Sequence, residues 1–131
     1  MLLLVVVTGC REAGPTVVPV TGVVLHKGQP VPNLHLHFLP ENGRPSWGAT
    51  DPTGRFKLNY TADQDGAVVG QHKVFVQYKP SSMEAELDML AGKLQKPAGL
   101  DDILSKYGNM ETSTKVVEIT AETREIELIL D

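Results

Sequence analysis

Two histidines stand two residues apart, at His35 and His37, in a segment that alternates apolar and polar residues. Because side chains alternate between the faces of a β-strand, both imidazoles project from one face, about 7 Å apart. That geometry suits a transition metal if a third ligand, such as His26 or His72, comes near. The alternative is two solvent-facing polar residues. We favour this alternative and expect no cofactor, because no Cys/His cluster with metal-site spacing accompanies the pair.

The single cysteine, Cys10, follows an apolar run, with an aliphatic residue three positions before it and two small residues between. This spacing resembles the lipobox of bacterial lipoproteins. The resemblance implies cleavage before Cys10 and lipid on its sulfur, so that residues 1–9 are a signal peptide and residues 10–16 a tether. No Lys or Arg precedes the run, which indicates an atypical signal or a start upstream of Met1. The alternative is a first strand with a buried free cysteine.

Trp47 is the only tryptophan, and the surrounding turns place it near a loop or hairpin edge. Its ring could stack on a sugar or on a partner protein, or it could pack over the edge of the fold. Residues 63–66 contain part of a calcium-loop pattern, but Thr61 and His72 occupy the outer ligand positions, so a turn is the better interpretation.

Motifs of the common enzyme classes are absent from the sequence, including G-x-S-x-G, H-E-x-x-H, G-x-x-x-x-G-K and G-x-G-x-x-G. We therefore predict a protein that is not an enzyme. A small hydrolase whose Ser, His and Asp meet only in the folded chain stays as an alternative.

Composition limits the remaining classes. The chain has 131 residues, a net charge of −4 and 41% hydrophobic residues, which fits one globular domain. The excess of acidic side chains and the 5% aromatic content argue against a nucleic-acid partner.

Turns cut a period-two apolar pattern into seven predicted strands, the pattern of an all-β sandwich or barrel. Between the fifth and sixth strands, apolar residues at helical spacing predict a helix over Met83–Leu94, and a second helix follows over Asp102–Tyr107. We expect the first helix to cover one end or face of the sandwich, with a lid, dimer contact or docking surface as alternatives. The predicted strands are Val17–His26, Leu34–Leu39, Ser46–Asp51, Arg55–Tyr60, His72–Tyr78, Lys115–Thr120 and Arg124–Leu130.

Several segments together resemble the carboxypeptidase regulatory-like domain, as found in short bacterial lipoproteins. They are VTGVV at 20–24, GQPVPN at 28–33, LHLHFLP at 34–40, GATD at 48–51, GRF at 54–56 and GQHKV at 70–74. The resemblance implies a transthyretin-like (prealbumin-like) seven-stranded Greek-key β-sandwich over residues 17–131. Two departures are the helical insert, about 82–107, and Trp47, where the pattern has a small or polar residue. The family supplies no catalytic residues to carry over.

The sequence as a whole predicts a non-enzymatic domain, anchored to a membrane of the cell envelope through lipid on Cys10. Its loops would bind an envelope protein or a glycan. One alternative is a metal- or carbohydrate-binding module using His35, His37 or Trp47, and the other is the small hydrolase.

Overall fold

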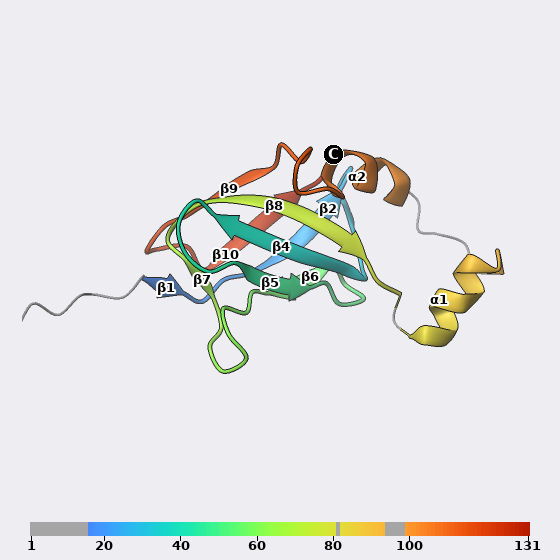
Figure 1. Ribbon diagram of the computed structural model, residues 1–131, viewed down its shortest axis with the longest axis horizontal. Helices are drawn as coiled ribbons and strands as arrows, with labels where there is room; N and C mark the ends of the chain where they lie inside the picture. The colour runs from blue at the N-terminus through green and yellow to red at the C-terminus, as the bar shows by residue number, and fades with distance from the viewer. Residues whose placement is uncertain (1–15, 81, 94–98) are drawn as a thin grey trace, which may run out of the picture.

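The computed structural model describes residues 16–80, 82–93 and 99–131. Strand is the main secondary structure in these ranges, and there are two helices (Figure 1). The strands are β1 (Val17–Val18), β2 (Thr21–His26), β3 (Gln29–Pro30), β4 (Leu34–Pro40), β5 (Ser46–Ala49), β6 (Arg55–Lys57), β7 (Ala67–Val68), β8 (Gly70–Tyr78), β9 (Val116–Ile119) and β10 (Glu125–Ile129). The helices are α1 (Met83–Leu90) and α2 (Leu100–Tyr107).

Two four-stranded sheets make up most of the fold. One has the order β5-β4-β8-β9, and all its pairs are antiparallel. In the other, β2 pairs with β10 in parallel and with β3 and β6 antiparallel. In Figure 1 the first sheet lies in front of β2 and β10. The layers are consistent with an all-β sandwich.

The core lies between these sheets and confirms the predicted alternation along β4. Leu34, Leu36 and Phe38 are completely buried, whereas the residues between them lie on the other face. Other sheet residues in the same core cluster are Val24, Phe56, Val74, Val76, Ile119 and Leu128. Each large aliphatic side chain buried this way contributes roughly 1.5–3 kcal/mol to folding.

The described residues form ten strands where the sequence predicted seven. The predicted strand Val17–His26 is two strands, because Pro19 between them has no N–H to donate to a ladder. The first of these, β1, pairs with β7 in a separate two-stranded sheet. Neither β7 nor the short β3 was among the predicted strands. β3 pairs with the end of β2.

A turn over residues 51–54 joins the predicted strands Ser46–Asp51 and Arg55–Tyr60, but these two arms belong to different sheets. Before the turn, β5 pairs with β4, and after the turn, β6 pairs with β2. The arms meet again at an antiparallel bridge between Trp47 and Asn59. The chain therefore crosses from one sheet to the other here.

Asp51 organises this turn. Its Oδ1 accepts hydrogen bonds from the hydroxyl of Thr53 (2.6 Å), the backbone N–H of Thr53 (2.8 Å) and that of Arg55 (3.0 Å). These bonds favour the carboxylate, with the Thr53 hydroxyl contributing most, and they lower the pKa of Asp51 below its ordinary value of 3.8.

Asp51→Ala is therefore expected to lower the urea midpoint at pH 7. A lowered carboxyl pKa stabilises the fold above the ordinary pKa, and that stabilisation is lost as pH falls through the folded-state value. The gap between wild type and variant should therefore shrink as pH falls below the ordinary carboxyl pKa of 3.8. Urea titrations at pH 7 and at a pH below 3.8 measure the difference in midpoint between wild type and Asp51→Ala. Asp63→Ala is the control, because it removes an exposed acid in another turn. A gap of equal size at both pH values would contradict the expectation.

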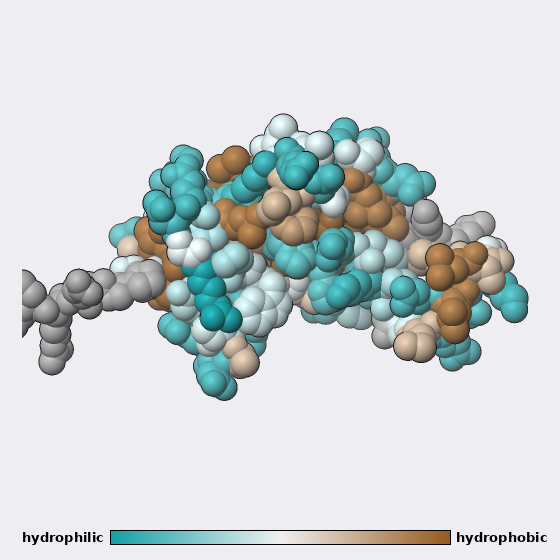
Figure 2. Space-filling model, viewed as in Figure 1, coloured by the Kyte–Doolittle hydropathy of each residue, from teal (hydrophilic) through white to brown (hydrophobic). Residues whose placement is uncertain are grey.

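The two helices differ in how they pack. Leu100 and Ile103 of α2 are 1% exposed and join the core. No residue of α1 is buried, and its apolar Met83, Leu87 and Leu90 are 77%, 60% and 80% exposed. Figure 2 shows this hydrophobic surface on α1, at the end of the molecule away from β1.

The expectation that the first helix covers the sandwich is therefore wrong for α1, and α2 takes that role. α1 also ends at Leu90, earlier than predicted, where Gly92 with φ 75° turns the chain out of the helix. Leu94, which the helical pattern included, lies outside the described residues. Within the described ranges, no helix combines the length and apolarity needed to cross a membrane.

Candidate functional site

The outer face of sheet β5-β4-β8-β9 brings together three of the residues singled out in the sequence. His37 of β4 is paired with Trp47 of β5 on one side and with Phe75 of β8 on the other. We call Trp47, His37 and Phe75 the aromatic row. His35 lies in the neighbouring row with Gln77. In Figure 2 this face shows hydrophobic and hydrophilic surface intermixed.

The rings of His37 and Phe75 are stacked, with centroids 4.4 Å apart and planes 9° from parallel. The distance between the ring centroids is close to the spacing of about 4.8 Å between neighbouring strands. The two rings therefore lie face to face, and their edges point away from the sheet. Trp47 is 38% exposed at the open end of the row. Its backbone is held to Asn59 by two backbone hydrogen bonds of 3.1 and 2.7 Å. Trp47 therefore presents an accessible indole from a backbone that is hydrogen-bonded in place at the sheet edge.

Sequence reasoning missed Phe75. Phe75 lies between Val74 and Val76 in the predicted strand His72–Tyr78, and because both valines are buried, Phe75 lies on the outer face. A large apolar side chain at an outward position of a strand signals a binding surface when other exposed apolar or aromatic side chains adjoin it. That signal was available in the alternation of β8, but its pairing with His37 was not.

The polar residues of this face also interact. His37 donates from Nε2 to Oε1 of Gln77 at 3.2 Å, because an amide oxygen only accepts. The pKa of His35 is lowered from its ordinary value of 6.5, first by partial burial and then by the positive charge of Lys79 and by His37. Both effects favour the neutral imidazole, so His35 is a neutral hydrogen-bonding group at pH 7.

The other two histidines do not join this face. His72 is completely buried, donates from Nε2 to the carbonyl of Val68 at 2.7 Å and lies 5.9 Å from the ring of Phe38. His26 belongs to β2, in the other sheet. The expectation that either histidine could approach His35 and His37 is therefore wrong. Within the described ranges, no three His, Cys, Asp or Glu residues are placed to hold a metal ion.

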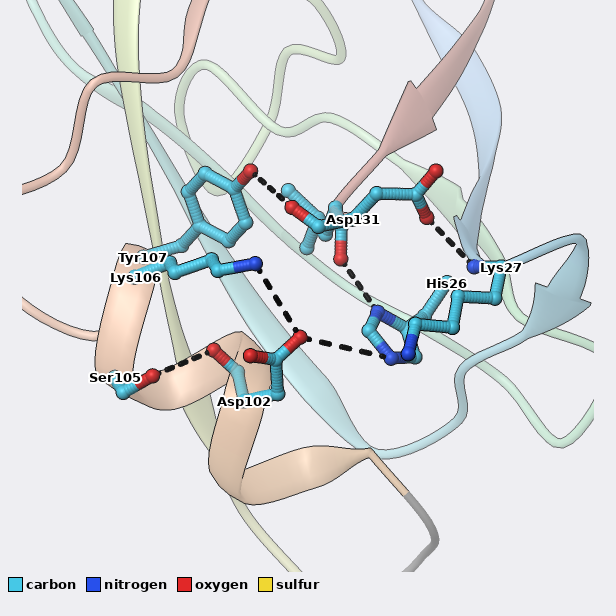
Figure 3. Close-up of polar contacts among 8 residues, drawn as sticks. His26, Lys27, Asp102, Ser105, Lys106, Tyr107 and Asp131 are labelled. Atoms are coloured by element: carbon cyan, nitrogen blue, oxygen red, sulfur yellow. Dashed lines mark hydrogen bonds and ion pairs between the residues drawn. The ribbon is translucent and has the colours of Figure 1, made fainter.

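His26 lies instead in a cluster at the C-terminal end of β10 (Figure 3). Its Nδ1 donates to the carbonyl of Leu130 at 2.7 Å, and its Nε2 is 3.9 Å from the Asp102 carboxylate. Asp102 also lies 3.5 Å from Lys106, and its carbonyl accepts a 2.8 Å hydrogen bond from the Ser105 hydroxyl. A serine, a histidine and an aspartate are thus close together, as the hydrolase alternative requires.

The geometry of this cluster does not fit nucleophilic catalysis. In a catalytic triad the carboxylate holds Nδ1 and the serine hydroxyl lies against Nε2. Here Nδ1 is bonded to a carbonyl, and the Ser105 hydroxyl is bonded to its own helix. Gly99 also lies against the ring, and a Cβ added to it would be 2.6 Å from Nε2. The contacts instead connect β2, α2 and the end of β10.

Comparisons with known proteins add no constraint. No protein-family model, curated protein or solved structure matches this chain. The resemblance to carboxypeptidase regulatory-like domains therefore stays a prediction from the sequence.

Proposed function

We propose that this protein is a non-catalytic, lipid-anchored β-sandwich module of the cell envelope that binds glycan through the outer face of sheet β5-β4-β8-β9. One observation carries the proposal: the exposed Trp47 is paired across the sheet with His37, whose ring is stacked on Phe75 of the next strand. We further propose the transthyretin-like Greek-key topology and the carboxypeptidase regulatory-like family for residues 17–131.

Sugar recognition combines an aromatic ring that covers the apolar C–H face of a pyranose with polar groups that bond its hydroxyls. Trp47 supplies the ring, and neutral His35 and Gln77 supply polar groups in the next row. The three residues sit on paired strands, so little conformational freedom is lost when a ligand binds.

The proposed anchor leaves this face open. Lipid on Cys10 would hold the domain to a membrane through residues 10–16, which lead into β1. β1 lies at one end of the molecule, whereas β4 and β8 run along its length (Figure 1). If the domain is tethered at that end, the outer face of the sheet does not face the membrane and is accessible to glycan in the envelope.

Trp47→Ala is expected to reduce binding of the protein to insoluble peptidoglycan about tenfold or more, the usual cost of removing a central aromatic contact. Co-sedimentation of the full chain with purified sacculi in detergent and EDTA measures it. Met83→Ala removes an apolar side chain on α1 that is more exposed than Trp47, and it is the control, expected to bind as wild type. Equal binding of folded Trp47→Ala and wild type would overturn the proposal. Wild type that does not co-sediment at all would point to a protein partner instead.

A further inference from the structure

We propose that His35, His37 and the side-chain oxygen of Gln77 form a binding site for a divalent transition metal, with Cu²⁺ preferred over Zn²⁺. The site uses the face proposed for glycan but does not depend on glycan binding. Two nitrogen donors and one oxygen donor suit these borderline ions, and affinity at such sites rises toward Cu²⁺.

The three donors are already gathered by strand register. Gln77 pairs directly with His35 across β4 and β8, and its side chain reaches diagonally to His37. His35 and His37 share a face because they are two residues apart on one strand. Gln77 is thus the third ligand that the sequence pattern needed, and His26 and His72 are not.

The distance between two of the donors matches coordination. Nε2 of His37 and Oε1 of Gln77 are 3.2 Å apart. A metal with bonds of about 2.0–2.2 Å to each of two adjacent ligands holds those atoms about 3 Å apart. An ion can therefore take the place of the proton that lies between them, while that proton moves to Nδ1 of the same ring.

One further feature prepares the ligands. Stacking on Phe75 holds the His37 ring in one orientation, which lowers the entropy lost on binding. Lys79 acts against the site, because its charge faces His35 and repels a cation. We therefore expect a dissociation constant of about 1–10 µM and not a tighter one.

Trp47 makes the site directly measurable. It is the only tryptophan and is paired with His37, so Cu²⁺ bound there should quench its fluorescence. The full chain is titrated with CuSO₄ at pH 7.5, and saturable quenching that EDTA reverses is expected. The double variant His35→Asn/His37→Asn should lose at least about tenfold in affinity, equivalent to 1.4 kcal/mol. Gln77→Leu should lose a smaller factor.

Two more variants separate the site from nonspecific binding. Lys79→Met should bind Cu²⁺ more tightly, because it removes the opposing charge. Cys10→Ser should quench like wild type, which excludes the thiol as the ligand. The proposal is overturned if quenching is not saturated by about 100 µM Cu²⁺, or if the double histidine variant quenches like wild type. Neither result bears on glycan binding, which is measured in EDTA.

Discussion

Gly22→Ala is expected to lower the free energy of unfolding by about 3 kcal/mol or more, a large part of the stability of a domain of this size. Gly22 lies in β2, between β10 and β6. A Cβ there would collide with the carbonyl oxygen of Ile126 and come within 2.7 Å of the Phe56 ring. The oxygen belongs to the backbone of the paired strand and cannot swing aside, so the pairing itself must open.

Gly28→Ala is the matched control. Gly28 has φ 80°, but an added Cβ meets no atom within 4 Å. Its replacement should therefore cost only the backbone strain of an alanine in that region, about 1–2 kcal/mol. Urea denaturation followed by circular dichroism gives both values. Equal destabilisation by the two variants would contradict the assignment of Gly22 to the contact between β2 and β10.

Cys10→Ser is expected to abolish lipid attachment completely. The sulfur of Cys10 is the proposed acceptor, and no other cysteine is present to replace it. Lipidation at one cysteine with more than one acyl chain gives stable membrane binding, whereas a single chain gives only marginal binding.

The measurement is incorporation of an alkyne-tagged palmitate by bacteria that express the full chain. Wild type should carry the label and a mature N-terminus at residue 10, and Cys10→Ser should carry no label and keep residues 1–9. Ala13→Ser introduces a serine nearby and should label like wild type. Wild-type protein that takes no label would contradict the anchor.

The local pattern of the sequence predicted most of the strands and their inner faces. Alternation in 34–38 correctly placed Leu34, Leu36 and Phe38 in the core and put His35 and His37 on the opposite face. The alternation of apolar and polar residues is a local property of one strand, so it can be recognised without knowing which strands pair with it. For the same reason it could not show which strands become neighbours.

The features that the sequence did not predict depend on contacts between residues far apart in the chain. That Trp47, His37 and Phe75 line up follows from the register of β5, β4 and β8, which packing and turn geometry set together. The exposure of α1 was also hidden, because an apolar stripe at helical spacing has the same sequence whether or not it is covered. The contact of His26 with Leu130 joins residues 104 positions apart, beyond the reach of any local motif.

Because Trp47 is the only tryptophan in the sequence, its fluorescence emission reports directly whether the outer face of sheet β5-β4-β8-β9 binds glycan. The full chain is titrated in detergent and EDTA with soluble glycan strands released from peptidoglycan. Stacking of a sugar on the indole should shift the emission to shorter wavelength and saturate, while Gln77→Leu should need a higher glycan concentration for the same shift. An emission spectrum that stays unchanged up to about 1 mM glycan, a concentration that corresponds to a binding free energy of only about −4 kcal/mol, would show that this face does not bind glycan.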